Sequence, residues 1–210
     1  MRKIHVLGVM LAALAFSAVA TASASAVEWL DNGAKIGVAL SVVTTGLLEL
    51  EDMGNGVKVH CEGRFLGTVG PGAADEITLA EPLTTEGDLI ECPVTKGVAG
   101  ICPVGATADV EAVHLPWKTT LLEEVGEIRD DIENSGAGVP GYTVKCEGQT
   151  DTCEGATSAK VTPLVSPVPS EFDAKSAGAA CKGVLFAGEG LITGSGTIQL
   201  TEAEQELTVS

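Results

Sequence analysis

Basic residues are scarce in this sequence. Lysine and arginine together number 12, against 29 aspartates and glutamates, and the formal net charge is −17 at pH 7. The summed field of so acidic a chain opposes the approach of phosphates. We therefore expect no nucleic-acid partner and no attraction to anionic lipid.

Histidine and the aromatic residues are also rare, which limits the available chemistry. There are 3 histidines, and aromatic residues make up 3% of the chain. A serine hydrolase needs a histidine base and a nucleophile on a tight turn, and neither Gly194-Ser195-Gly196 nor Asn134-Ser135-Gly136 completes the G-x-S-x-G motif. The C-x₂₋₄-C spacing of zinc sites and the D-x-D-x-D-G pattern of calcium loops are absent. The sequence thus predicts no metal site and no cofactor.

Long apolar runs are absent except at the N-terminus. A basic start, Met1 to His5, precedes an apolar stretch from Val6 to Ala20 and a small-residue run that ends at Ala26. This is the layout of a secretory signal peptide. About 15 apolar residues are fewer than the roughly 20 that a membrane-spanning helix needs. We expect a signal peptide over residues 1–26, a single secreted domain over residues 27–210, and no membrane span after cleavage.

Cysteines are present, and all of them lie beyond the predicted cleavage site. The 6 residues are Cys61, Cys92, Cys102, Cys146, Cys153 and Cys181. An even number of cysteines behind a signal peptide predicts two or three disulfides in an oxidising compartment.

Spacing does not decide among the possible connectivities, but it favours two short loops. Cys92 and Cys102 each begin a Cys-Pro-Val tripeptide, with turn-prone glycines between them. Cys146 and Cys153 flank a polar, turn-like insert. The expected disulfides are therefore Cys92–Cys102, Cys146–Cys153 and, by elimination, Cys61–Cys181.

Strand patterns recur along the chain. Residues 57–61, 108–112 and 142–146 alternate apolar and polar side chains with the period of a half-buried strand. Shorter runs at 184–186, 190–192, 197–200 and 206–209 are separated by turn residues, and the chain holds 26 glycines. Evenly spaced short strands with Gly/Pro-rich turns predict one all-β domain, an antiparallel β-sandwich or barrel-like fold.

One segment, Leu121 to Glu133, has apolar residues near helical spacing. Gly126 interrupts it, and its second half is acidic. We favour a β-hairpin that turns near Gly126 over a helix.

The most distinctive short stretch is His114-Leu115-Pro116-Trp117. A histidine and a tryptophan after a strand can line a ligand pocket, and His114 and Trp117 are the candidate ligand-binding residues. The alternative is that Pro116 sets a bend at a strand end and Trp117 fills the core.

The densest acidic run offers a possible carboxylate pair for glycoside hydrolysis. Its members are Glu123, Glu124, Glu127, Asp130, Asp131 and Glu133. Such a run is more often a solvated face, and no pattern in it distinguishes a proton donor from a nucleophile.

With the leader, the spaced cysteines, the stretch from His114 to Trp117 and Pro140-Gly141-Tyr142 in view, the chain resembles uncharacterised exported, cysteine-containing proteins of high-GC Gram-positive bacteria. The resemblance implies an extracytoplasmic location and β structure. It carries no activity over to any residue.

Together these features favour a secreted, non-catalytic binding or structural protein of the cell exterior or envelope, monomeric and with an unknown partner. Two alternatives stay open. The first is a secreted hydrolase of polysaccharide or cell wall. The second is a carrier of a small apolar ligand, in which Trp117 would have to line an internal cavity.

Overall fold

The computed structural model describes residues 27–72, 74–82, 92–134, 136–173, 179–183, 188–202 and 205–210. The predicted signal peptide and the predicted strand at 184–186 lie outside these ranges. Within them all regular structure is β-strand, which confirms the all-β prediction. Among the described residues, no helix has the length and apolar content that crossing a membrane requires.

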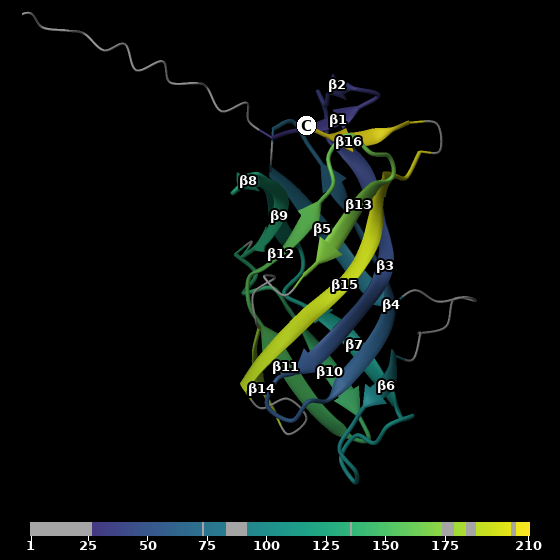
Figure 1. Ribbon diagram of the computed structural model, residues 1–210. Helices are drawn as coiled ribbons and strands as arrows, with labels where there is room; N and C mark the ends of the chain where they lie inside the picture. Colours follow the sequence, from purple (N-terminus) through teal and green to yellow (C-terminus); the bar gives the residue numbers. More distant parts are fainter. Residues whose placement is uncertain are drawn as a thin grey trace, which may run out of the picture.

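The strands are mostly antiparallel neighbours in one large sheet (Figure 1). Their bounds are β1 Trp29–Asp31, β2 Ala34–Lys35, β3 Leu40–Asp52, β4 Lys58–Val69, β5 Ala74–Pro82, β6 Cys92–Lys96, β7 Thr107–Val113, β8 Trp117–Glu124, β9 Glu127–Glu133, β10 Gly141–Cys146, β11 Gln149–Glu154, β12 Thr157–Val161, β13 Val168–Phe172, β14 Ala179–Lys182, β15 Gly188–Leu200 and β16 Leu207–Val209.

Three long strands, β3, β4 and β15, run through the whole length of this sheet and divide the molecule into two lobes (Figure 1). In the upper lobe they are joined by β5, β8, β9, β12 and β13, and the pairing of β13 with β15 turns the sheet back on itself. In the lower lobe β6, β7, β10, β11 and β14 do the same through the pairing of β4 with β6. Some pairings are short, since β6–β7 and β12–β13 each have two register pairs, so both lobes are barrel-like but not closed.

A row of glycines marks the waist, where the three long strands pass from one lobe to the other. Gly46 of β3 stands in register with Gly63 of β4 on one side and with Gly196 of β15 on the other. A Cβ on Gly46 would lie 2.4 Å from the carbonyl oxygen of Ser195, so this close strand approach requires glycine. Gly46 belongs to the same alternating face as Val42 and Leu50, which are core residues, so β3 places no side chain in the interior at this position.

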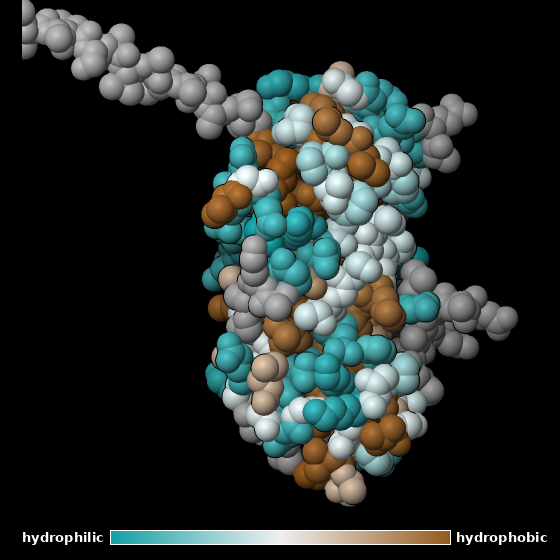
Figure 2. Space-filling view, in the orientation of Figure 1, coloured by the Kyte–Doolittle hydropathy of each residue, from teal (hydrophilic) through white to brown (hydrophobic). Residues whose placement is uncertain are grey.

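Each lobe has its own hydrophobic core. The lower core gathers Val59, Val94 and Val144 with all six cysteines, and the upper core gathers residues such as Val42, Leu121 and Ile198. A small sheet of β1, β2 and β16 covers the end of the upper lobe, where the buried Trp29 joins the upper core. On the face shown in Figure 2, polar and apolar side chains are interspersed, and a band of intermediate hydropathy crosses β15 and β3.

The segment from Leu121 to Glu133 is a hairpin, as predicted. Strands β8 and β9 pair from Lys118↔Glu133 to Glu124↔Glu127. The connecting residues Val125 and Gly126 have φ angles of 51° and 80°, the two positive values of a type I′ turn. The three alternating segments are also strands, in β4, β7 and β10.

The predicted disulfide pairing is wrong, although the expectation of two or three disulfides is confirmed. The bonds are Cys61–Cys92, Cys102–Cys146 and Cys153–Cys181. Strand register, not loop length, decides them. Cys153 and Cys181 are direct register partners between β11 and β14.

Strand register also excludes the two predicted disulfides that would close short loops, Cys92–Cys102 and Cys146–Cys153. Between β10 and β11, Cys153 stands opposite Tyr142, while Cys146 stands opposite Gln149, so these two cysteines are too far apart along the ladder. Cys92 stands opposite Ala108 of β7. Its disulfide partner is Cys61 of β4, and the Cα atoms of the two cysteines are 4.7 Å apart.

Candidate functional site

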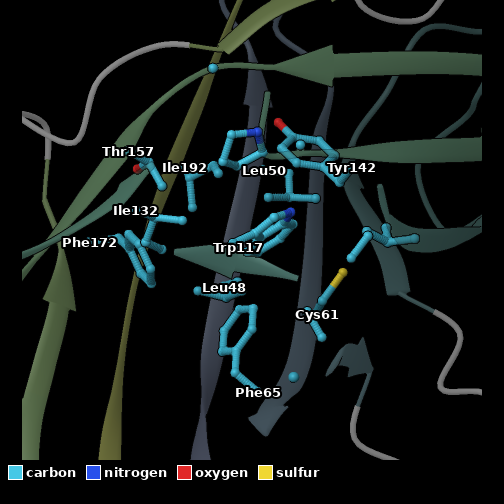
Figure 3. A pocket seen from close by; sticks show the side chains of 17 residues that line it. Leu48, Leu50, Cys61, Phe65, Trp117, Ile132, Tyr142, Thr157, Phe172 and Ile192 are labelled. Atoms are coloured by element: carbon cyan, nitrogen blue, oxygen red, sulfur yellow. The ribbon is translucent and has the colours of Figure 1, made fainter. Parts of the chain in front are cut away.

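A cavity lies at the waist, between the two lobes (Figure 3). Its volume is about 90 Å³, and it is partly open to solvent. The lining is almost entirely apolar and comes from both lobes: Leu48, Leu50, Cys61, Gly63, Phe65, Ala80, Val110, Ala112, Trp117, Ile132, Pro140, Gly141, Tyr142, Gly155, Thr157, Phe172 and Ile192. For comparison, a dry apolar cavity of about 150 Å³ holds a benzene molecule.

Strand alternation places these side chains. Successive residues of a strand face opposite sides, so Leu48 and Leu50 of β3 face the interior together, as do Cys61 and Phe65 of β4. Gly63, a member of the glycine row, stands between Cys61 and Phe65 on the same face of β4, and its backbone forms part of the cavity wall. Gly63, which has no side chain, thus leaves space in the cavity wall between Cys61 and Phe65.

Trp117 lies in the middle of the cavity wall (Figure 3). Its side chain is buried, and its indole Nε1 donates a hydrogen bond of 2.8 Å to the carbonyl oxygen of Val113. Its ring packs on Phe65 with centroids 6.4 Å apart and planes inclined at 47°. With the indole nitrogen satisfied, the ring presents an apolar surface to the cavity.

His114 lies outside this wall. Its Nδ1 is 2.8 Å from the carbonyl oxygen of Val139 and 3.3 Å from the Glu154 carboxylate, and the side chain is exposed. The structure thus does not bring His114 and Trp117 together in one pocket, although ligand binding by either of them stays a prediction. The cavity residues that sequence reasoning missed are the apolar strand residues, whose pattern is that of any core.

Two hydroxyl groups on cavity-lining residues are buried without a hydrogen-bond partner among the described residues: Tyr142 Oη and Thr157 Oγ1. Burial raises the pKa of the Tyr142 phenol, and the charge of Asp52 raises it further. The phenol is therefore neutral at physiological pH.

A second, smaller hollow of about 40 Å³ lies inside the upper lobe. Asp75 and Asp130 are both in its wall, with Trp29 and Phe65 as its aromatic members. The Trp29 indole Nε1 donates to Asp75 Oδ2, and the Gly70 amide donates to Asp75 Oδ1 at 2.9 Å. Asp130 hydrogen-bonds with the Thr119 side chain through one oxygen, while its Oδ1 is buried and has no partner among the described residues.

Both carboxyls of this hollow bind protons more tightly than usual. Burial raises the pKa of Asp75 to about 6, against the lowering effect of the hydrogen bonds from Gly70 and Trp29. Burial raises the pKa of Asp130 to about 7, and the charges of Asp75 and Asp131 add to the rise while the Thr119 hydrogen bond opposes it. The two carboxyls thus interact electrostatically across the hollow.

The acidic run of β8 and β9 does not act as one cluster. Glu123, Glu124 and Glu133 are exposed, and Glu127 forms an ion pair with Lys160 at 3.0 Å. Asp130 alone of the run lines the hollow, and its electrostatic partner there, Asp75, was not among the predicted candidates. A hollow of about 40 Å³ is too small for a sugar ring, so this pair gives the hydrolase alternative no support.

The donor set of the hollow does not suit a divalent cation. Asp75 already accepts hydrogen bonds on both oxygens, and Ca²⁺ requires about six to eight oxygen ligands. Across the described part of the chain, no group of three or more His, Cys, Asp or Glu residues is placed to hold a metal ion.

Comparison of the chain with protein-family models, with curated proteins and with solved structures gives no match.

Proposed function

We propose that this protein is a secreted, non-catalytic binding protein whose waist cavity holds a small apolar ligand. The proposal rests on the cavity itself, which is lined from both lobes by apolar side chains and has Trp117 in the middle of its wall. A partly open apolar cavity between rigid strands is a usual form of a small-molecule binding site. The cavity gives the expected binding protein a candidate site, and it favours a carrier of a small apolar ligand over a hydrolase.

Location outside the cytoplasm is part of the same proposal. Three disulfides lie in the core of the lower lobe, and such bonds persist in oxidising compartments. The signal-peptide pattern of residues 1–26 supports export. Cys61, at one side of the cavity, is fixed to Cys92, so a disulfide supports the cavity wall.

The volume limits the ligand. About 90 Å³ accommodates a group somewhat smaller than benzene, such as a short alkyl chain, with any longer part extending to solvent. Burial of such a chain contributes about 0.8 kcal/mol for each CH₂ group. Short linear alcohols are therefore suitable first probes.

The test is titration of the protein with 1-butanol and 1-pentanol, monitored by Trp117 fluorescence and by calorimetry. The chain has 2 tryptophans, so Trp29→Phe isolates the signal of Trp117. Ala112→Leu on β7 should fill the cavity and abolish binding, whereas Glu111→Leu, exposed on the opposite face of the same strand, should not. Equal binding by wild type and Ala112→Leu would contradict the proposal.

A further inference from the structure

We infer that the ligand of the waist cavity is an apolar amine, whose ammonium group enters the hollow between Asp75 and Asp130. This inference rests on the proposed function, because it assigns a head group to the ligand whose apolar body fills the cavity. It is carried by the position, charge and unsatisfied hydrogen bonding of the hollow.

The two spaces adjoin along the same strands. On β9, Ile132 lines the waist cavity and Asp130, two residues away on the same face, lines the hollow. On β8, Trp117 and Thr119 have the same relation, and two residues of a strand span about 7 Å. Phe65 belongs to both walls. A ligand with its alkyl part at Trp117 therefore needs only a short reach to place a polar end at Asp130.

The charge of the hollow selects a cation. Its lining holds three acidic residues, Asp75, Asp130 and Glu76, and no basic residue among those described. Lys118 is 3.6 Å from Glu76 but is not part of the lining. Arg129 precedes Asp130 but faces the other side of β9, where its guanidinium binds Asp173. No described side chain therefore neutralises the carboxyl pair from within.

The unsatisfied acceptor points to a hydrogen-bond donor. Asp130 Oδ1 is buried and unpartnered among the described residues, and a buried acceptor left in this state destabilises the fold. An ammonium group supplies a hydrogen-bond donor to this oxygen and a positive charge that balances the carboxylate.

The experiment compares three ligands of one chain length on the whole protein at pH 8: pentylamine, 1-pentanol and pentanoate. The chain-length match holds the apolar contribution constant, so differences report the head group. We expect calorimetry to show the amine binding at least tenfold more tightly than the alcohol, and the carboxylate more weakly than either. Asp130→Asn should reduce the amine to the affinity of the alcohol and leave the alcohol unchanged. Glu133→Gln, exposed on the opposite face of β9, should change neither.

A second measurement covers the case in which Asp130→Asn fails to fold. In wild type, amine affinity should fall between pH 8 and pH 5, because Asp75 and Asp130 take up protons, while alcohol affinity should stay constant. Glu76, Asp131 and Lys118 are the other charged groups near the hollow. Equal affinities for amine and alcohol, or a pH-independent amine affinity, would overturn the ammonium site and leave the apolar cavity standing. Absence of binding by all three ligands would instead overturn the proposed function.

Discussion

Arg129 holds the Asp173 carboxylate with two of its guanidinium nitrogens, at 3.1 and 3.3 Å, from a side chain that is only 4% exposed. The remaining nitrogen, Nε, donates to the Ser158 hydroxyl at 2.8 Å, and Nη2 also donates to the Ser158 carbonyl oxygen at 3.2 Å. This arginine thus joins β9 to β12 and to the end of β13 on the outer face of the upper lobe.

Replacement of Arg129 by lysine should destabilise the protein by about 1–3 kcal/mol, because an ammonium cannot form the paired contact and leaves buried acceptors unsatisfied. Urea unfolding monitored by circular dichroism measures the change. The control is Lys160→Met, which removes the solvent-exposed ion pair with Glu127 and should change stability much less than Arg129→Lys does. A similar effect of the two substitutions would show that the Arg129 contact is no stronger than a surface pair.

Asp52 terminates β3 with a fully buried carboxylate. Its two oxygens accept hydrogen bonds from the amides of Gly54 and Asn55, at 2.9 and 2.8 Å. Asp52→Ala should lower the free energy of unfolding by about 1–3 kcal/mol through the loss of both bonds. Asp109→Ala on the exposed face of β7 should lie within about 0.5 kcal/mol of wild type, and a smaller effect at Asp52 than at Asp109 would contradict the expectation.

Gly46→Ala tests the glycine row. The added methyl group would meet the Ser195 carbonyl oxygen at 2.4 Å, so strand β3 or β15 must shift. We expect a loss of about 1–3 kcal/mol in thermal or urea unfolding. Gly37→Ala has no atom within 4 Å of the new methyl group and should be neutral. Equal melting temperatures for the two variants would exclude the close approach of β3 and β15.

The buried carboxyls make stability depend on pH. Asp75 and Asp130 have folded pKa values of about 6 and about 7, above the ordinary 3.8, so the folded state binds protons that the unfolded state has released. Stability should therefore fall as pH rises from about 4 to about 7. Between pH 5 and pH 8, the free energy of unfolding of Asp130→Asn should fall by on the order of 2 kcal/mol less than that of wild type, measured by urea unfolding without ligand. An unchanged slope would show that Asp130 ionises normally.

The disulfides can be mapped directly. Digestion without reduction, followed by mass spectrometry, should give the cross-linked pairs Cys61–Cys92, Cys102–Cys146 and Cys153–Cys181. Removal of the Cys102–Cys146 pair by a double alanine substitution should cost about 2–4 kcal/mol. A cross-link between Cys92 and Cys102 would contradict the strand register.

The sequence predicted what depends on local alternation. The period of two in β4, β7 and β10 and the break at Gly126 predicted strands and a hairpin, because these follow from neighbouring residues alone. The disulfide partners could not be predicted, since they depend on which strand pairs with β4 and β11 across long separations. A loop-length argument has no access to that register.

The hollow was missed for a related reason, although one signal was available. Asp130 stands in phase with Ile128 and Ile132, so a carboxylate occupies the apolar face of its strand, which marks it as an inward-facing acid. Asp75 gave no comparable signal, because the β-bulge that shifts the register opposite Leu66 and Gly67 changes which residues of β5 face inward. Only the paired strands show that the two acids share one space.

The three long strands also fix the order in which the chain can fold. Strand β15 is a wall of both lobes and pairs along its length with β3, whose residues lie near the other end of the chain. Neither lobe can complete its strand pairing until β15 is available to pair with β3. The chain should therefore fold late, slowly and as one cooperative unit, with no half that is stable by itself.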